Sequence, residues 1–473
     1  MLKRLIENYI EFNRGCVYNN QTYTSAYLKK RYHQIYNRVS KLNNTFTVGI
    51  LLENKIDYFL SILSCMQSDI TYVPLDCSWP NKYINSIKKN CNIKTLVNKN
   101  FLRRTEKIKK AKNLNSKDNK LLYIMFTSGS TGNPKGCQIP VSAYYNFVKW
   151  VINDFKTIPN NQKIILNTNF TFDVSLMEVA LILTKKLQFV ANDNRDTMTL
   201  LDSIHKHDVN ILCIVPNNLN LLIEYNNNKK FLKTLKNIFV AGSQFQKNLL
   251  DKITKSTCLK LANIFNCYGP TEATIYCSYK SLNINNKNLL FNGNVSIGKA
   301  IKGNALKIFS LTNEKKLKNS SNGELYISGK QLMKGYNNAQ NSGLLKLENK
   351  VFYPTGDLAI KKYCEFFILG RKDEIIKTSG NRVNLNAIDD ILLKNKKISE
   401  AKTINIPDLI RENKIISFVV LNKNILKYSK IKILNFIKLF LPNYYLPHDI
   451  IIMKKLPKEV SGKISKKKLL NTI

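Results

Sequence analysis

Short apolar runs alternate with longer amphipathic segments over most of the chain. The clearest runs are residues 48–52, 163–166, 211–215 and 238–241. Runs of this length are typical of buried strands, and the segments between them have the spacing of amphipathic helices. This alternation predicts an α/β fold in which helices connect buried strands.

The pattern changes near residue 373. Residues 365–369 predict a strand just before this point, and a smaller block of mixed helical and strand pattern follows it. We therefore expect a large N-terminal domain of layered α/β sheets over residues 1–372. A small α+β C-terminal domain is expected over residues 373–473.

Two helices are expected inside the C-terminal block. Asn386 is suited to cap the first of them, which carries one apolar face. The second is expected to begin near Ser429 and to end at Leu441, because Pro442 cannot continue a helix.

The composition describes a globular protein with an unusual charge. The chain of 473 residues is 44% hydrophobic and carries a formal net charge of +42. The excess is mostly lysine, spread along the chain together with many asparagines and isoleucines, and all three have A/T-rich codons. Codon bias explains this better than a nucleic-acid surface, which would concentrate arginine and aromatic residues in one stripe. We expect no nucleic-acid partner.

The cysteines and the apolar runs indicate in which cellular compartment the protein is expected. Ten cysteines occur without a C-x-x-C pair or a neighbouring histidine cluster, which favours reduced thiols. No apolar run approaches the ~18 residues needed to span a bilayer. Charges interrupt the first eight residues, unlike a signal peptide. We expect a cytoplasmic location and no membrane partner.

A glycine-rich segment follows the apolar run 121–126. Only 18 glycines occur in the chain, yet three of them fall within residues 127–136. Backbone N–H groups, hydroxyls and a lysine suit this loop to hold phosphate, although it is not a Walker A loop. The alternative is a flexible surface loop. The candidate nucleotide-binding residues are Thr127, Ser128, Gly129, Ser130, Thr131, Gly132 and Lys135.

Further segments carry chemistry-bearing residues in a fixed order along the chain. With the glycine-rich loop, they are residues 71–76, 127–136, 172–175, 266–272, 323–327, 354–358, 370–373, 441–447 and 461–463. In this order they resemble the adenylate-forming superfamily, and within it the adenylation domains of non-ribosomal peptide synthetases and the D-alanine:carrier-protein ligases. The resemblance covers essentially the whole chain, and it implies ATP and Mg²⁺ as cofactors.

The segment around Tyr268 offers a flat ring, a tight turn, a hydroxyl and a carboxylate. The resemblance implies that Tyr268 stacks on adenine, Thr271 contacts the α-phosphate and Glu272 holds Mg²⁺. It also places Asn266 and Gly269 at the nucleotide. The alternative is a turn with a solvated glutamate.

Three residues near the end of the large domain are matched to ribose and phosphate. The resemblance implies that Asp357 binds both ribose hydroxyls, Arg371 contacts the ribose and Arg382 contacts phosphate. Taken alone, Asp357 could be only a turn-forming residue, and each arginine only a solvated surface residue.

The resemblance assigns catalysis to Lys463, which would reach between the substrate carboxylate and the α-phosphate. It assigns the hinge about which the C-terminal domain turns to Asp373. Since Lys463 stands in a lysine-rich run, the residue pattern alone is equally consistent with a basic tail.

Asp173 occupies the position at which amino-acid-activating members pair a carboxylate with the substrate ammonium group. A buried charge needs a partner, so this residue predicts an amine on the substrate. The alternative is a helix cap or a loop aspartate. The other pocket positions are uncharged, which predicts a neutral, apolar amino acid of small to medium size. They are Val174, Met177, Ile214, Phe239, Ala241, Cys267, Ile275 and Tyr276.

The resemblance therefore implies an ATP-dependent amino-acid adenylating enzyme that acts in non-ribosomal-peptide-type biosynthesis. The activated amino acid would pass to the phosphopantetheine thiol of a separate carrier protein in trans. The alternatives are a D-alanine:carrier-protein ligase, an acyl-CoA ligase, or a nucleotide-binding descendant without catalysis. The last is suggested because Asn384 and Ala387 stand where the family has acidic residues.

Overall fold

The computed structural model describes residues 1–42, 47–103, 120–127, 135–194, 196–226, 231–282, 289–309, 320–339, 342–347, 349–372, 375–408, 411–422, 425, 428–457 and 464–473. The chain divides into two compact units. The first comprises Met1–Cys77, Asn90–Phe126 and Gly136–Lys372, and the second comprises Ser78–Lys89, Thr127–Lys135 and Asp373–Ile473.

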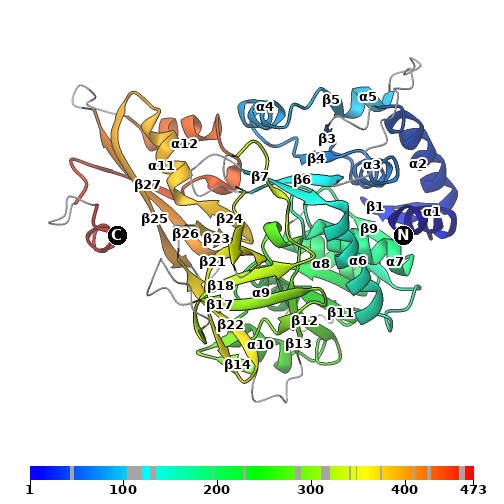
Figure 1. The fold of residues 1–473 in the computed structure, drawn as a ribbon. Coiled ribbons are helices and arrows are strands. Elements are labelled where there is room, and N and C mark those ends of the chain that lie inside the picture. The colour runs from blue at the N-terminus through cyan, green and yellow to red at the C-terminus, as the bar shows by residue number, and fades with distance from the viewer. Residues whose placement is uncertain are drawn as a thin grey trace. The chain divides into compact units, whose positions relative to one another are not determined.

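The largest sheet of the first unit has nine strands among the described residues (Figure 1). Its central strands, from β12 to β1, are parallel, and antiparallel strands flank them on both sides. In spatial order the strands are β16 (Lys299–Ala300), β13 (Ser278–Ser281), β12 (Asn263–Tyr268), β11 (Asn237–Val240), β10 (Ile211–Ile214), β8 (Lys163–Ile165), β9 (Gln188–Ala191), β1 (Cys16–Tyr18) and β2 (Gln21–Tyr23).

A second sheet has six strands in the part of the chain that the structure describes, and it belongs to the same unit except for Thr127 and Lys135. Its strands β4, β3 and β5 are parallel neighbours, and β19 pairs antiparallel with β7. In spatial order they are β19 (Gly335–Tyr336), β7 (Lys135–Pro140), β6 (Leu121–Thr127), β4 (Tyr72–Leu75), β3 (Val48–Leu51) and β5 (Thr95–Val97).

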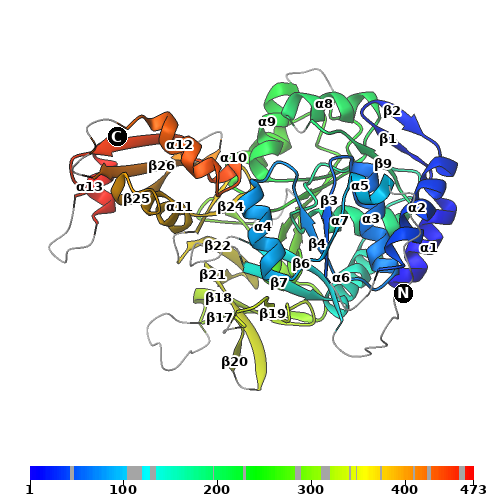
Figure 2. The ribbon, with the colours of Figure 1, turned by 90° about the horizontal axis from the view of Figure 1, so that it is seen from above.

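Helices form layers against these sheets. The helices α3 (Lys55–Gln67) and α7 (Ser175–Lys185) are buried along almost their whole length and share one core with both sheets. Helices that are apolar all round need such a position. The outer helices of the unit are α1 (Leu2–Phe12), α2 (Ser25–Val39), α5 (Lys99–Arg103) and α6 (Val141–Asp154), with α8 (Thr197–Lys206), α9 (Pro216–Asn226) and α10 (Lys247–Lys255) on the other face of the large sheet (Figure 2).

A third, antiparallel sheet completes the first unit. It brings Asp357 on β21 directly opposite Arg371 on β22. Its strands are β17 (Asn304–Phe309), β18 (Asn322–Gly329), β20 (Leu345–Leu347), β21 (Lys350–Lys362) and β22 (Glu365–Arg371), and a separate ribbon joins β14 (Leu290–Phe291) to β15 (Asn294–Val295).

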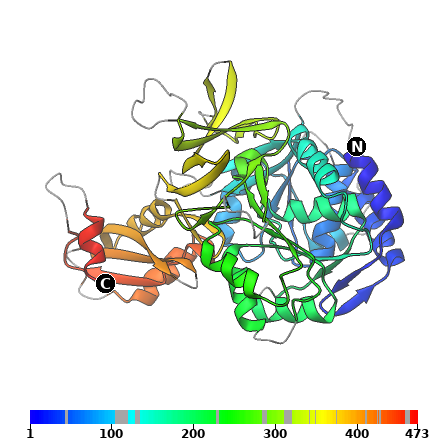
Figure 3. The same ribbon diagram turned by 90° about the horizontal axis from the view of Figure 1, so that it is seen from below.

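The second unit is built on the three-stranded sheet β25–β26–β27 (Figure 3). The helices α11 and α12 share an apolar cluster with one face of this sheet, and α13 packs on the other face. Its elements are α4 (Asn81–Asn90, whose last residue belongs to the first unit), β23 (Ile375–Thr378), β24 (Asn381–Asn384), α11 (Leu385–Leu393), β25 (Ile398–Asp408), β26 (Glu412–Leu421), α12 (Lys430–Lys438), η3 (Asn443–Tyr445), β27 (Asp449–Met453) and α13 (Lys466–Leu470).

The predicted α/β class is confirmed, and β3, β6, β8, β10, β11 and β22 lie on the predicted apolar runs. Two helix ends were wrong. Asn384, not Asn386, caps α11, because its side chain accepts a hydrogen bond from the Asn386 N–H at 2.9 Å. The helix α12 starts at the predicted place but ends at Lys438, three residues before Leu441. Among the described residues, no helix has the length and apolarity of a membrane span.

Candidate active site

The described part of the candidate site is built on the loop that follows β12. The strand ends at Tyr268, and the short 3-10 helix η1 (Thr271–Ala273) begins after a tight turn. A Cβ atom on Gly269 would lie 2.4 Å from the Ile275 carbonyl oxygen, so glycine is required there. The Cys277 N–H donates to the Tyr268 carbonyl at 2.9 Å, which closes the loop back on its own start.

Asp173 is buried immediately before α7. It is 8% exposed, and its Oδ2 atom has no hydrogen-bond partner among the described residues. Asp173 does not cap α7, because the N-cap is Val174. Burial raises the pKa of Asp173 to about 6; the Thr271 hydroxyl opposes this rise, and the charge of Glu272 adds to it. An ionised carboxylate in this environment needs a cation beside it.

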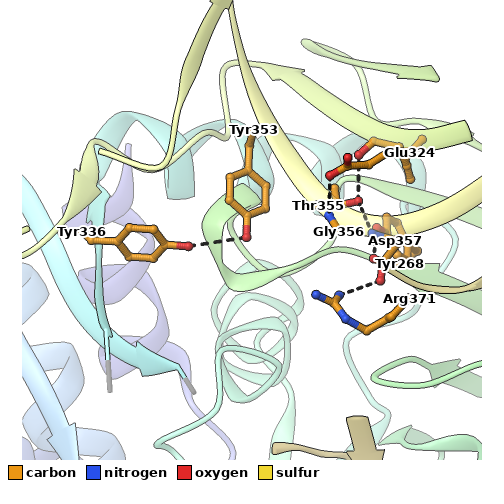
Figure 4. Close-up of polar contacts among 9 residues, drawn as sticks. Tyr268, Glu324, Tyr336, Tyr353, Thr355, Gly356, Asp357 and Arg371 are labelled. Atoms are coloured by element: carbon orange, nitrogen blue, oxygen red, sulfur yellow. Dashed lines mark hydrogen bonds and ion pairs between the residues drawn. The ribbon is translucent and has the colours of Figure 1, made fainter. Parts of the chain in front are cut away.

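Asp357, on β21, accepts from one donor on the paired strand β22 and from a second donor at the end of β12, which belongs to another sheet (Figure 4). The Tyr268 hydroxyl donates to its Oδ2 atom at 2.5 Å, and Arg371 Nη1 donates to its Oδ1 atom at 2.6 Å. The Arg371 side chain is 15% exposed, so it is not a solvated surface residue. A carboxylate has about four lone-pair sites, so two remain for two further hydroxyl donors. This arrangement fits a ribose.

The turn before Asp357 is held by other residues. The Asp357 N–H donates to Thr355 Oγ1 at 3.0 Å, and the Thr355 hydroxyl donates to the Leu325 carbonyl at 2.7 Å. The Gly356 N–H donates to Glu324 Oε1 at 3.1 Å, with a φ of 71° that favours glycine. Since Thr355 and Glu324 fix the turn, the Asp357 carboxylate is available for binding.

Glu272 is held from the side by a tyrosine. It is 1% exposed, which excludes the solvated-glutamate alternative. The Tyr336 hydroxyl donates to Glu272 Oε1 at 2.7 Å. The same hydroxyl lies 3.5 Å from the Tyr353 hydroxyl (Figure 4). A carboxylate oxygen is the ligand type that Mg²⁺ prefers, so Glu272 fits the implied metal. Among the described residues no cluster of three histidine, cysteine or acidic side chains forms, so the metal would need further oxygens, such as those of phosphates.

Most of the residues predicted for the amino-acid pocket are buried in one large core cluster of the first unit. One core cluster contains Met177, Phe239, Ala241, Cys267, Ile275 and Tyr276, and Val174 packs against it. Ile214 does not join them: it packs in the cluster on the other face of the sheet. Side chains alternate along a strand, so Cys213, which is fully buried, shares the face of Phe239 and Cys267 instead. The structure therefore places Cys213, not Ile214, beside the other predicted pocket residues.

The comparison with protein families decides the assignment. The model of the family described as AMP-binding enzyme matches residues 11–337. The chain belongs to the AMP-binding enzyme family. It is thus an AMP-forming ligase of the adenylate-forming superfamily, as the order of its motifs predicted.

Two relatives match this AMP-binding enzyme over most of both chains. Zwittermicin A synthase ZmaJ of Bacillus cereus is 27% identical, with 96% of this chain and 91% of the relative covered. A D-alanine–D-alanyl carrier protein ligase of Staphylococcus epidermidis is 27% identical, with 88% and 87% covered. Other relatives are much longer: the match spans only 8% of bacitracin synthase 1 of Bacillus licheniformis, at 25% identity and over 89% of this chain.

Solved structures share the fold of this AMP-binding enzyme. The Vibrio cholerae adenylation domain AlmE, in complex with glycyl-adenosine-5'-phosphate, matches with a TM-score of 0.82 at 20% identity, over 100% of this chain and 97% of that one. The fused adenylation–PCP protein NpsA-ThdA of Klebsiella oxytoca matches with a TM-score of 0.81 at 17% identity, over 95% and 93%. At these identities the likeness concerns the fold.

Several predicted residues of the AMP-binding enzyme lie outside the described residues. They are Ser128, Gly129, Ser130, Thr131, Gly132, Asp373 and Lys463. Thr127 ends β6 and Lys135 begins β7, on either side of the glycine-rich loop. The backbone of Arg382 lies on β24, while its side chain is not described. Asn266 is buried, and its amide donates to the Ser296 carbonyl at 2.9 Å, so it also ties β12 to a neighbouring segment.

Sequence reasoning missed Tyr336, Gln331 and Cys213. The first two contact the site loop, which is the segment Gly269–Tyr276 after β12. The third lies in the core cluster that contains most of the predicted pocket residues. Tyr336 stands 64 positions after Glu272, so no local spacing relates them. The strand period of two would have found Cys213 from Phe239, had the register of β10 and β11 been known. Gln331 lacks a motif of its own, and only its buried contacts reveal it.

Proposed function

We propose that the chain activates an amino acid with ATP and then passes the aminoacyl group to the thiol of a carrier-protein phosphopantetheine. The substrate carboxylate oxygen attacks the α-phosphorus of ATP, a new P–O bond forms, and pyrophosphate leaves. The thiol then attacks the carbonyl carbon of the aminoacyl-AMP, which forms a thioester and releases AMP. Bound Mg²⁺ would supply neutralisation of the phosphate charge.

The observation that carries this proposal is the buried Asp173 carboxylate. Its Oδ2 atom has no hydrogen-bond partner among the described residues. A substrate ammonium group would supply both the missing donor and the missing charge. A carboxylic acid without an amine would leave this carboxylate buried and uncompensated, so the residue favours amino acids over aryl or fatty acids.

The other residues of the sequence-predicted pocket support a neutral substrate side chain. Phe239, Cys267 and Tyr276 are buried and share one core cluster. None of them carries a charge that would pair with an ionised side chain. Phe239 and Tyr276 are bulky, so a pocket that they line would favour a small to medium amino acid. We therefore propose an uncharged amino acid of the size of alanine, proline or valine.

Two residues of the second unit belong to the proposal through their place in the motifs. Lys463 is assigned to the developing negative charge at the α-phosphate, and Arg382 to a phosphate oxygen. Asp373 is assigned to the hinge. The proposed partner is a carrier protein in trans. The name of the D-alanine–D-alanyl carrier protein ligase supports a carrier protein, because it gives one for that relative.

A D-alanine:carrier-protein ligase is the second candidate, because such a ligase matches 88% of this chain at 27% identity. ATP–pyrophosphate exchange with glycine, with the other standard amino acids in their L form and with D-alanine tests both. Exchange with an L-amino acid supports the first candidate, and a strong preference for D-alanine supports the second. Lys463→Ala should abolish exchange and the neighbouring Lys466→Ala should retain it. ATP binding without any exchange would identify a descendant that has lost catalysis.

A further inference from the structure

The segment Gln331–Tyr336, which follows β18 and ends with β19, forms hydrogen bonds to the loop after β12 that carries Glu272 and Tyr276. Gln331 is fully buried. Its Nε2 donates to the Tyr276 carbonyl at 2.8 Å and to the Thr274 carbonyl at 3.1 Å. In return the Thr274 hydroxyl donates to the Gln331 carbonyl at 2.7 Å. The backbone that carries the pocket residues Ile275 and Tyr276 is therefore tied to this one glutamine.

The tied backbone is in a costly conformation. Thr274 has a φ of 55° and Ile275 a φ of 71°. Left-handed φ values are rare for β-branched residues and persist only where surrounding contacts enforce them. Gln331 supplies such contacts to the Thr274 carbonyl, which belongs to the peptide between the two residues. Without them we expect the loop to relax and to move the Ile275 side chain.

The other end of the segment holds Glu272 at two points. The Met333 N–H donates to the Glu272 carbonyl at 2.8 Å, and the Tyr336 hydroxyl donates to Glu272 Oε1 at 2.7 Å. The ring of Tyr336 is itself fixed, because Gly343 approaches it so closely that a Cβ there would lie 2.5 Å from Cε2. The Glu272 carboxylate is therefore restrained in both position and rotation.

We propose that Gln331 and Tyr336 are positioning residues of the adenylation site. Gln331 fixes the wall of the amino-acid pocket through the strained Thr274–Ile275 backbone. Tyr336 fixes the Glu272 carboxylate for the magnesium ion of ATP. The inference rests on the proposed function, and it adds that two contacts from one segment serve two different reactants.

The test uses the full chain with the variants Gln331→Glu and Tyr336→Phe. The Gln331 amide oxygen accepts from Asn304, and Gln331→Glu keeps an oxygen at that position but loses the Nε2 donor. We expect it to raise the KM for the amino acid about tenfold with an unchanged Mg²⁺ requirement. Tyr336→Phe should raise the Mg²⁺ concentration for half-maximal exchange several-fold and leave the amino-acid KM unchanged. If Gln331→Glu does not fold, Gln331→Met takes its place.

Calorimetry adds a measurement that does not depend on turnover. Tyr336→Phe should weaken the binding of ATP in the presence of Mg²⁺ several-fold and leave ATP binding in EDTA unchanged. Tyr326→Phe is the matched control, since it removes the hydroxyl of another mostly buried tyrosine, which packs with Phe309 and Phe352, and it should change neither value.

The outcomes separate the inference from the function on which it rests. If Glu272→Gln changes the Mg²⁺ dependence but Tyr336→Phe does not, the positioning role of Tyr336 is overturned alone. If Glu272→Gln changes nothing either, the role of Glu272 in the proposed function fails. If Gln331→Glu and Tyr336→Phe change both parameters equally and in step with thermal stability, the segment is merely structural and the inference is wrong.

Discussion

Arg371 and Asp357 are direct cross-strand partners on β22 and β21, and Arg371 Nη1 lies 2.6 Å from Asp357 Oδ1. Tyr268 reaches the other oxygen of the same carboxylate from the end of β12. The Tyr268–Asp357 hydrogen bond therefore joins two sheets of the first unit at the position where the nucleotide is expected. It also holds the carboxylate in one rotation before any nucleotide binds, which lowers the ordering cost of binding.

Removal of the Arg371–Asp357 contact should weaken ATP binding. Arg371→Ala leaves the Asp357 carboxylate short of a charge-assisted hydrogen bond worth about 1.5–3 kcal/mol. We expect the Kd for ATP, measured by calorimetry, to rise at least tenfold. Lys280→Met is the control, because it breaks an equally short and equally buried ion pair to Glu365 on the same strand. An unchanged Kd in Arg371→Ala, or an equal rise in Lys280→Met, would count against the nucleotide role.

Amino-acid binding should depend on pH through Asp173. Its pKa of about 6 means that the carboxylate becomes neutral as the pH falls through that value. A neutral carboxyl group does not attract an ammonium ion, so we expect affinity for the amino acid to fall between pH 7 and pH 5. Asp173→Asn should bind weakly at every pH, with a flat profile over this range. A wild-type profile as flat as that of the variant would contradict the ion pair.

The same residue should reduce the stability of the ligand-free protein. The pKa of Asp173 is raised to about 6 from its ordinary value of 3.8, so the folded state binds the proton more tightly than the unfolded state. The contribution of Asp173 to stability is therefore fully present below its ordinary pKa and is lost as the pH rises through about 6. Asp173→Asn should raise the free energy of unfolding at pH 8 by on the order of 1–3 kcal/mol and have little effect at pH 4. Denaturant unfolding at both values tests this, and a destabilised variant at pH 8 would refute it.

Substrate choice should respond to Cys213 more than to Ile214. Cys213 shares a core cluster with Phe239 and Cys267, whereas Ile214 packs on the opposite face of the sheet. Cys213→Ala should change the ratio of kcat/KM for two amino acids that differ by one methylene, by about 3- to 10-fold. Ile214→Val should lower thermal stability slightly and leave the ratio unchanged. A larger change in the ratio for Ile214→Val would restore Ile214 to the pocket.

The hydrophobic pattern predicted the α/β class well because the strands are short apolar runs with clear ends. The strands β3, β8, β10 and β11 coincide with such runs. Periodicity does not tell which face of a fully buried strand meets a ligand, because both faces are apolar. Ile214 was assigned to the pocket through the family resemblance, and periodicity could not correct that assignment to Cys213.

The motifs predicted the residues that would contact the amino acid and ATP, but not the residues that position those side chains. Asp357, Glu272 and Asp173 stand in short segments with recognisable order. Their partner Tyr336 and the loop anchor Gln331 lie more than 50 positions from the residues that they bind. Helix ends failed for a local reason: Asn384 and Asn386 are both good capping residues, and only the backbone distinguishes them.

The central claim is that Asp173 accepts a substrate ammonium group while ATP is cleaved beside it. The most direct test is ATP–pyrophosphate exchange with the best amino-acid substrate and with the same acid lacking its amino group, in the wild type and in Asp173→Ala. We predict that the wild type exchanges with the amino acid at least a hundredfold faster, and that Asp173→Ala loses most of that difference. Equal exchange with both acids in the wild type would contradict the account.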